Sequence, residues 1–252
     1  MTTLAHQADT ETLKPDDSFT LAARRIFYLF GAMAVVTVML FGLAYSGQGP
    51  MRSVGYSSHT APLQIVIGND VYAIPENMIR RAQQRREGIS DRVDLTVLAH
   101  TGSGYSEAEL AEFANTDNQT VETVILSIAK RDSLLDMTAR FHPVLKRALV
   151  PNSMTKAEKG MFEAQLSPQY GFMNEYLIFS GERDAAGAPV FVARCHNQRV
   201  EPQLLHDCET DLFVGSSSVL TVRFARHQLE QWQGFHLWLD GFMRALQNPE
   251  MS

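Results

Sequence analysis

Two cysteines and two histidines form the densest group of reactive side chains in the sequence. Cys195 and His196 are adjacent, His206 and Cys208 follow a short distance later, and the chain contains no other cysteine. Such side chains can form a disulfide, bind a soft metal ion or exchange electrons. Twelve residues separate the two cysteines, and the segment that precedes the domain predicts export to an oxidising compartment, as argued below. We therefore expect a Cys195–Cys208 disulfide.

A metal centre is the alternative for the same residues. All four side chains, Cys195, His196, His206 and Cys208, are of types that bind zinc or copper. On a strand, however, Cys195 and His196 point to opposite faces, and the spacing differs from that of common structural zinc modules. A redox-active thiol pair is a further alternative, although the sequence has no C-x-x-C motif. The disulfide interpretation is preferred, and it requires no cofactor.

The only compact run of positive charge, IRRAQQRRE, contains four arginines: Arg80, Arg81, Arg85 and Arg86. On a helix expected for residues 75–87, they would lie around one side. Such a surface suits anionic lipid headgroups or an acidic partner. The alternative is an ordinary solvated helix face paired with local carboxylates.

Aromatic residues recur with glycines near the C-terminus. Gly234-Phe235 and Gly241-Phe242 lie one heptad apart. Small residues beside large rings can cradle a partner helix or an apolar ligand, which makes Phe235 and Trp238 candidate contact residues. The alternative is that the glycines allow close packing on the domain's own sheet, with the aromatic rings in its core.

Local catalytic motifs are absent from the sequence. It has no nucleophile elbow, phosphate-binding loop, dinucleotide fingerprint or H-E-x-x-H motif. The adjacent His206 and Asp207 indicate acid–base chemistry only weakly, because neighbours on a strand diverge. The motifs identify no known family. They favour a binding or scaffolding protein over an enzyme, while leaving catalysis undecided.

An uncharged stretch of twenty residues, 26–45, lies near the N-terminus. As a helix it would be about 30 Å long, which matches the hydrocarbon core of a bilayer. Aromatic residues occur at both of its ends, as in interfacial belts. Cleavage after Ser46 is the alternative, but the stretch is longer than the about 7–15 residues usual in a signal peptide. We expect an uncleaved single-pass anchor in contact with the lipid bilayer.

Charges beside this stretch predict its orientation. Arg24 and Arg25 precede it, whereas the next cation after it is Arg52. The positive-inside rule then puts the N-terminus in the cytoplasm and the C-terminal domain outside, which in a Gram-negative bacterium is the periplasmic side of the inner membrane. One stripe of the helix predicts a membrane-protein partner or a homo-oligomer; its residues are Gly31, Val35, Val38 and Gly42.

The composition agrees with a folded domain behind an anchor. The chain has 252 residues, of which 45% are hydrophobic, and a formal net charge of −6. These values exclude a disordered chain and disfavour nucleic-acid binding. We expect four regions: a cytoplasmic tail at 1–25, the anchor at 26–45, a flexible linker at 46–62 and an exported domain at 63–252.

Alternating apolar residues predict several strands in the domain. A hairpin is expected around Gly68-Asn69-Asp70, and further strands at 91–98, 121–128, 175–179, 189–195 and 217–225. Helices are expected at 75–87, 106–114, 132–150 with a break at Pro143, and 226–247. The order predicts an α+β fold, with a single N-terminal transmembrane helix followed by a largely antiparallel sheet and helices packed on it.

Overall fold

The computed structural model describes residues 17–45 and 55–247, and our expectations for 1–16, 46–54 and 248–252 lie outside these ranges. The chain divides into two compact units, 1–52 and 53–252. The first contains helix α1 (Asp17–Tyr45). The second contains the strands together with helices α2 (Leu110–Phe113) and α3 (Trp232–Gln247).

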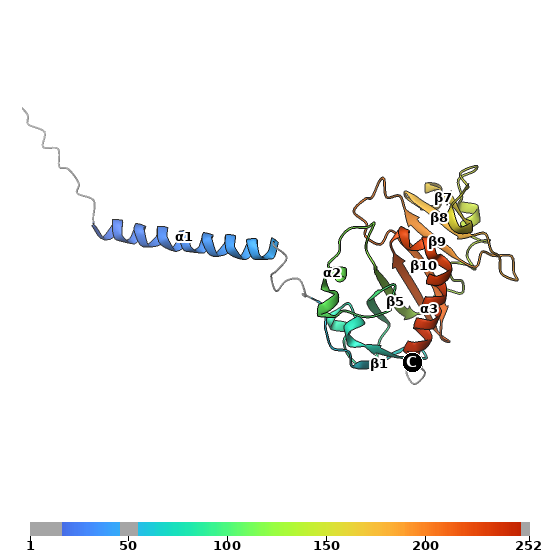
Figure 1. Ribbon diagram of the computed structural model, residues 1–252, viewed down its shortest axis with the longest axis horizontal. Coiled ribbons are helices and arrows are strands. Elements are labelled where there is room, and N and C mark those ends of the chain that lie inside the picture. The colour runs from blue at the N-terminus through green and yellow to red at the C-terminus, as the bar shows by residue number, and fades with distance from the viewer. Residues whose placement is uncertain (1–16, 46–54, 248–252) are drawn as a thin grey trace, which may run out of the picture. The chain divides into compact units, whose positions relative to one another are not determined.

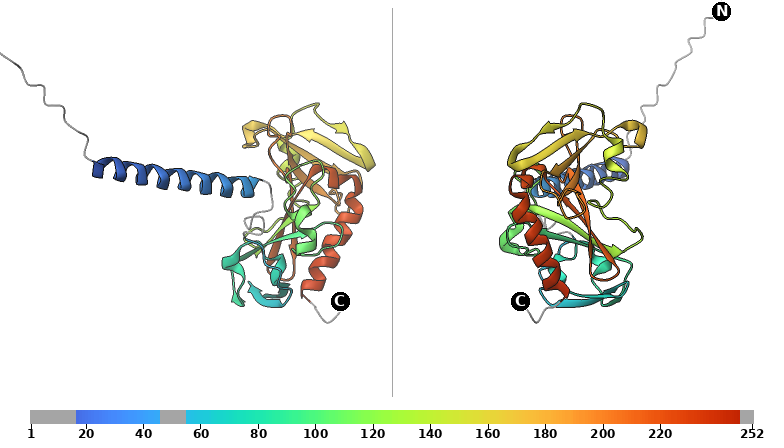
Figure 2. Two further views of the ribbon diagram at one scale, coloured as in Figure 1. Left: turned by 60° about the vertical axis from the view of Figure 1, so that its left-hand side comes forward. Right: turned by 90° about the vertical axis from the view of Figure 1, so that its right-hand side faces the viewer.

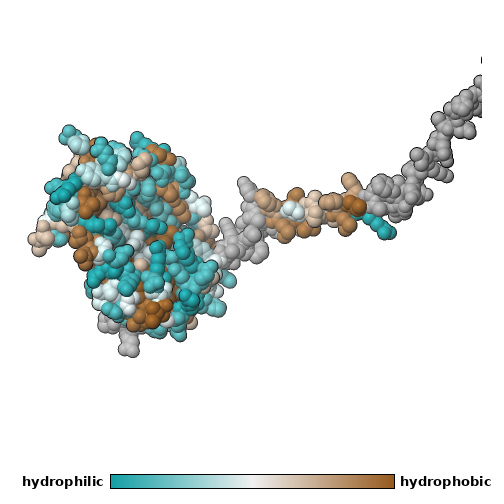
Figure 3. Space-filling view, turned by 180° about the vertical axis from the view of Figure 1, so that it is seen from behind, coloured by the Kyte–Doolittle hydropathy of each residue, from teal (hydrophilic) through white to brown (hydrophobic). Residues whose placement is uncertain are grey.

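Helix α1 is longer than the expected anchor. It begins at Asp17, so residues 17–25 are helical and not an irregular tail. These residues include Leu, Ala and Arg, which favour helix, and neither Gly nor Pro. Residues Arg24–Gly42 are long and apolar enough to cross a membrane, and none of this window is buried. Figure 3 shows the apolar side chains along the helix in brown.

The domain contains a large antiparallel sheet of eight strands, in the order β4-β5-β11-β10-β9-β8-β7-β6. Its bounds are β4 (Arg92–Leu98), β5 (Thr123–Lys130), β6 (Thr155–Lys156), β7 (Met161–Gln165), β8 (Glu175–Ser180), β9 (Val192–His196), β10 (Cys208–Val214) and β11 (Ser218–Phe224). A smaller sheet has the order β2-β1-β3, with β1 (Pro62–Ile67), β2 (Asp70–Pro75) and β3 (Gly88–Ile89). The mixed α+β architecture with a large antiparallel sheet is confirmed.

Short 3-10 helices connect many of these elements. They are η2 (Glu76–Met78), η3 (Ala82–Gln84), η4 (Glu107–Glu109), η5 (Leu145–Ala148), η6 (Glu158–Gly160), η7 (Pro168–Tyr170) and η8 (Arg226–Gln231). The last of these leads directly into α3, so the expected C-terminal helical region is confirmed.

The main core lies between one face of the large sheet, α3 and the β1–β2 hairpin. Alternate residues of β4, β5 and β11, such as Leu95, Leu126 and Val222, share this face because they are paired in register. They pack in one cluster with Leu239 and Met243 of α3. Figure 1 shows α3 in red across the strands, and Figure 2 shows the same helix from two further sides.

The opposite face of the sheet is covered in part by residues 137–149. Here Phe141 and Leu145 pack on Leu177, Phe179 and neighbouring apolar residues of β8 and β9. The expected helices at 132–150 are wrong: this segment forms turns and the single 3-10 helix η5. Its apolar side chains are buried on a sheet face that the chain crosses irregularly, and tertiary packing outweighs helix propensity.

The helix expected at 75–87 is also wrong. Residues in this range form η2 and η3, and between them Ile79 forms a bridge with Leu95 at the edge of the large sheet. Asn77 is buried, and its side-chain amide donates to the Tyr105 carbonyl oxygen at 3.0 Å. The bridge of Ile79 with a strand requires an extended backbone at this residue, which a continuous helix could not provide.

Residues 55–61, expected in the flexible linker, contact the domain. The Tyr56 ring stacks on Tyr105 with their centroids 5.1 Å apart, and the Ser57 hydroxyl donates to Glu76 at 2.7 Å. The His59 carbonyl accepts from the Asn77 backbone N–H at 2.7 Å. The domain therefore begins before residue 63.

Candidate functional site

The two cysteines lie directly opposite each other on β9 and β10. Cys195 and Cys208 are paired in the strand register, their Cα atoms are 4.0 Å apart, and their sulfurs form a disulfide. Both residues are buried in the main core. The expected disulfide is confirmed, and it closes the loop that carries His206 and Asp207.

The alternative metal site at Cys195, His196, His206 and Cys208 is therefore wrong. The two sulfurs are bonded to each other, and His196 Nδ1 lies 3.5 Å from a carboxylate oxygen of Glu201. Across residues 17–45 and 55–247, no group of three or more His, Cys, Asp and Glu side chains is placed to hold a metal ion.

His206 and Asp207 diverge and do not act on each other. His206 Nε2 lies 2.9 Å from the Thr123 carbonyl oxygen, and burial is the main cause that lowers its pKa to about 4. Asp207 is buried, accepts from the Arg226 backbone N–H at 2.9 Å, and has its pKa raised by burial. Each side chain binds the loop to a different segment of the chain. The adjacency of His206 and Asp207 in the sequence therefore reflects packing rather than acid–base chemistry.

The four arginines of the basic run do not share a helix face. Arg81 pairs with Asp94, with 3.1 Å between Nε and Oδ2. Arg85 donates to the Ile79 carbonyl from Nε at 3.1 Å and also to the Gly55 carbonyl, so its charge serves the domain's own backbone. Arg80 and Arg86 are exposed. The run is distributed over two turns, which corrects the single helical patch that we expected.

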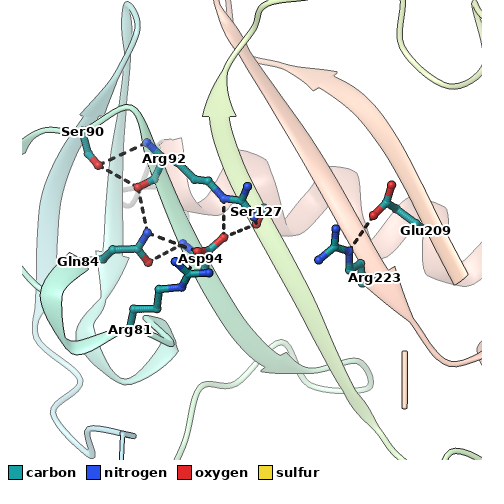
Figure 4. Close-up of polar contacts among 8 residues, drawn as sticks. All are labelled: Arg81, Gln84, Ser90, Arg92, Asp94, Ser127, Glu209 and Arg223. Carbon is teal, nitrogen blue, oxygen red and sulfur yellow. Dashed lines mark hydrogen bonds and ion pairs between the residues drawn. The ribbon is translucent and has the colours of Figure 1, made fainter. Parts of the chain in front are cut away.

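Asp94 lies at the centre of a polar network on the outer face of the sheet (Figure 4). Its carboxylate is 2.7 Å from Arg92 Nε, accepts from the Ser127 hydroxyl and faces Arg81. Gln84 completes the network, since its side-chain oxygen accepts from the Asp94 backbone N–H at 3.0 Å. Burial acts to raise the pKa of Asp94, but the hydrogen bonds and the two arginine charges outweigh it and lower the pKa.

A second network continues across the neighbouring strands. Glu209 of β10 pairs with Arg223 of β11 at 2.7 Å and with Arg194 of β9 at 3.1 Å, and Arg194 reaches Glu175 of β8 at 3.2 Å. Figure 4 shows Arg223 and Glu209 side by side on adjacent strands. The strand register places these residues in line, and such cross-strand pairs stabilise a sheet.

In both networks the central carboxylates are more buried than the arginines around them. The Asp94 and Glu209 side chains are 3% and 25% exposed, whereas those of Arg81, Arg92 and Arg223 are 61%, 50% and 53% exposed. The carboxylates thus lie against the sheet and hold the guanidinium groups outward. We call the surface formed by Arg81, Arg92 and Arg223 the arginine face. Guanidinium groups are planar donors that match the geometry of carboxylates.

Phe235 and Trp238 pack against other aromatic rings of the same domain. Phe235 is 8% exposed and packs on Phe224 with ring centroids 5.1 Å apart, while Trp238 stacks on Phe235 and Phe242. Phe235 therefore belongs to the domain's core, as the alternative interpretation predicted. Close packing on the sheet does not explain the two glycines, because a Cβ at Gly234 or Gly241 would meet nothing within 4 Å.

An open cavity of about 530 Å³ lies beside these aromatic rings, and a second of about 390 Å³ shares His227 with it. Both ring nitrogens of His227 are buried without a hydrogen-bond partner, and Nε2 lies 3.7 Å from Glu122. A histidine beside a carboxylate can transfer protons. No Ser, Thr or Cys lines either cavity in the part of the chain described, so neither cavity presents a hydroxyl or thiol of these residues as a nucleophile.

Helix α1 carries the remaining candidates on exposed positions. Gly31, Val35, Val38 and Gly42 have no covering residues within their own unit. The predicted helix partner therefore stays a prediction. The arginine face was missed as a site because Asp94, Arg223 and Glu209 are widely separated in sequence; the polar residues that alternate along β4 and β11 were its only local signal.

Comparisons with known proteins identify no family. No family model matches the chain, and no curated protein matches it. Among solved structures, the chain is similar to an immunity protein of the Stenotrophomonas maltophilia type IV secretion system, with a TM-score of 0.43 and 10% sequence identity over 74% of this chain and 93% of that chain. We draw no functional conclusion from a similarity of this size.

Proposed function

We propose that this protein is a single-pass membrane protein, with its N-terminus in the cytoplasm, that presents an extracytoplasmic domain for binding or scaffolding in an envelope complex. One observation carries the proposal: no residue of the apolar window Arg24–Gly42 is buried. An exposed apolar helix of this length requires a covering, and a bilayer is the covering that matches its length.

Two further features support the orientation. Arg24 and Arg25 lie at the N-terminal end of the apolar stretch, as the positive-inside rule requires for a cytoplasmic N-terminus. The Cys195–Cys208 disulfide fits an oxidising compartment for the domain, because cytosolic thiols are mostly kept reduced.

The arginine face is the surface that we assign to the partner. Its guanidinium groups are oriented by Asp94 and Glu209, so less side-chain entropy is lost on binding than with freely rotating cations. Arginine is also enriched among the residues that dominate binding energy at protein interfaces. The partner is therefore an acidic protein surface within the same envelope complex.

Membrane attachment and topology have a direct test. The full chain should stay in the membrane pellet after alkaline carbonate extraction, and a variant with Val35→Arg and Val38→Arg should be released. A reporter fused after Ser252 should be active only outside the cytoplasm. Release of the unaltered chain, or cytoplasmic reporter activity, would contradict the proposal.

Partner binding is tested with a site-specific photo-crosslinker in intact cells. A crosslinker at Thr221, which lies between the two networks on β11, should give one discrete adduct that Arg92→Glu and Arg223→Glu abolish. A crosslinker at exposed Lys156 of β6 serves as the control. Recovery of only the unmodified monomer with the crosslinker at Thr221, or an adduct that both charge reversals leave intact, would contradict the assignment of the arginine face to the partner.

A further inference from the structure

A separate cavity of about 320 Å³ lies over β7 and β8, on the sheet face that residues 137–149 cover. Its size falls at the lower end of the range for small-molecule sites. The lining residues are Phe141, His142, Lys146, Leu149, Met154, Phe162, Phe179 and Arg183. They come from four separate segments of the chain, so the tertiary fold alone creates the cavity.

Aromatic rings form the floor of this cavity. Phe179 lies between the other two rings, 5.0 Å from Phe141 and 5.8 Å from Phe162 between centroids, with the second pair stacked. Phe141 and Phe179 are buried, which fixes the positions of their rings. Met154 also lines the cavity and is 55% exposed. Fixed phenyl rings with a thioether beside them favour contact with another aromatic ring.

Positive charge lines the same cavity. The Arg183 guanidinium lies 5.5 Å from the Phe141 ring and 5.7 Å from the Phe179 ring, so it is held over the floor. Lys146 also lines the cavity, and no Asp or Glu does. Within residues 55–247 as described, neither Lys146 nor Arg183 forms an ion pair with a carboxylate. The cavity therefore combines an aromatic floor with two cations that no carboxylate of the described residues neutralises.

We propose that this cavity binds a small carboxylate that carries an aromatic ring, with the ring against Phe162 and Met154, which are more exposed than Phe141 and Phe179, and the carboxylate toward Lys146 and Arg183. Contact between rings selects for a ligand that has an aromatic ring, and a bidentate contact with the guanidinium group selects for a carboxylate. The site is independent of the arginine face, since the two share no residue.

The test uses the full chain in phosphatidylcholine nanodiscs and 2-naphthoate as the probe, titrated by calorimetry with empty nanodiscs as the blank. We expect saturable binding that weakens about fivefold in Lys146→Met and in Arg183→Met. Arg147→Met is the matched control, because Arg147 is exposed on the same turn but does not line the cavity. Its affinity should equal that of the unaltered chain.

Two further probes define the ligand class. The neutral analogue 2-naphthalenemethanol and the aliphatic anion octanoate should each bind more weakly than 2-naphthoate. Absence of saturable binding, equal affinity for either comparator, or an unchanged affinity in both cation variants would overturn the proposal. Lys146 and Arg183 are exposed, so both variants should fold, and an unchanged thermal unfolding midpoint would verify it.

Discussion

The Asp70 carboxylate accepts a hydrogen bond from the backbone N–H of Ser216 at 2.7 Å, across 146 positions of sequence. Asp70 follows the turn between β1 and β2, and Ser216 lies in the turn between β10 and β11. The hydroxyls of Ser216 and Ser218 donate to the same carboxylate, each at 2.8 Å. One ionised side chain therefore joins the hairpin to the large sheet.

Replacing this carboxylate should destabilise the domain in a pH-dependent way. Burial alone would raise the pKa of Asp70, but the hydrogen bonds from the serines outweigh it and lower the pKa from 3.8 to about 2. The ionised form thus stabilises the fold at pH above 3.8, and this contribution is lost as the pH falls through about 2. Asp70→Asn should lower the free energy of unfolding at pH 7 by about 2 kcal/mol.

Tryptophan fluorescence during urea unfolding measures this effect, since both tryptophans belong to α3. Asp91→Asn is the control, because Asp91 is exposed on the same domain. The difference between Asp70→Asn and the unaltered chain should shrink near pH 2. A difference that stays constant from pH 7 to pH 2 would show that the charge of Asp70 contributes nothing.

His206 should make the domain sensitive to mild acid. Burial lowers its pKa from 6.5 to about 4, so the folded state disfavours its protonation. Stability is therefore complete above pH 6.5 and falls as the pH decreases toward 4, by at most about 3 kcal/mol. His206→Gln keeps a donor for the Thr123 carbonyl but does not titrate, so its unfolding free energy should depend less on pH in this window. His100→Gln, at an exposed position, should leave the pH dependence unchanged; equal slopes for all three proteins would refute the assignment.

Removing the disulfide should destabilise the domain without altering its fold. Closing a loop of this length contributes about 3 kcal/mol, chiefly by restricting the unfolded chain. Replacing both Cys195 and Cys208 by alanine should lower the unfolding free energy by about that amount. Thiol labelling of the denatured, unreduced chain should modify no cysteine and should modify both after reduction. Labelling of both without reductant would contradict the bridge.

Two glycines should respond oppositely to alanine. A Cβ at Gly104 would lie 2.8 Å from the backbone carbonyl carbon of Asn77, so Gly104→Ala forces the chain apart and should cost about 1–3 kcal/mol. A Cβ at Gly241 meets nothing within 4 Å. Gly241→Ala should therefore stabilise α3 by about 0.5–1 kcal/mol. Urea unfolding of both variants checks the pair, and a destabilising Gly241→Ala would indicate that this face of α3 is covered.

Strand predictions succeeded where one face of a strand is apolar. Val93, Leu95 and Val97 alternate along β4, and Leu220, Val222 and Phe224 do so along β11; burial of one face produces this period directly. Strand β10 was not predicted, because Glu209 and Asp211 lower its strand propensity. Their charges are offset by arginines on β11 and on the 131–150 segment, which local sequence does not reveal.

The sequence by itself determined the properties that depend on neighbouring residues: the uncharged helical stretch, the alternating strands, the C-terminal helix and the pairing of the chain's two cysteines. Only the tertiary structure decided that Arg81 meets Asp94, that Asp70 meets Ser216, and that Phe141 meets Phe179 beneath Arg183. The physical reason is that loops, turns and the small hairpin pack against the large sheet from distant parts of the chain. This packing brings distant residues within bonding distance, and the energy of those contacts exceeds the local preferences from which sequence patterns arise.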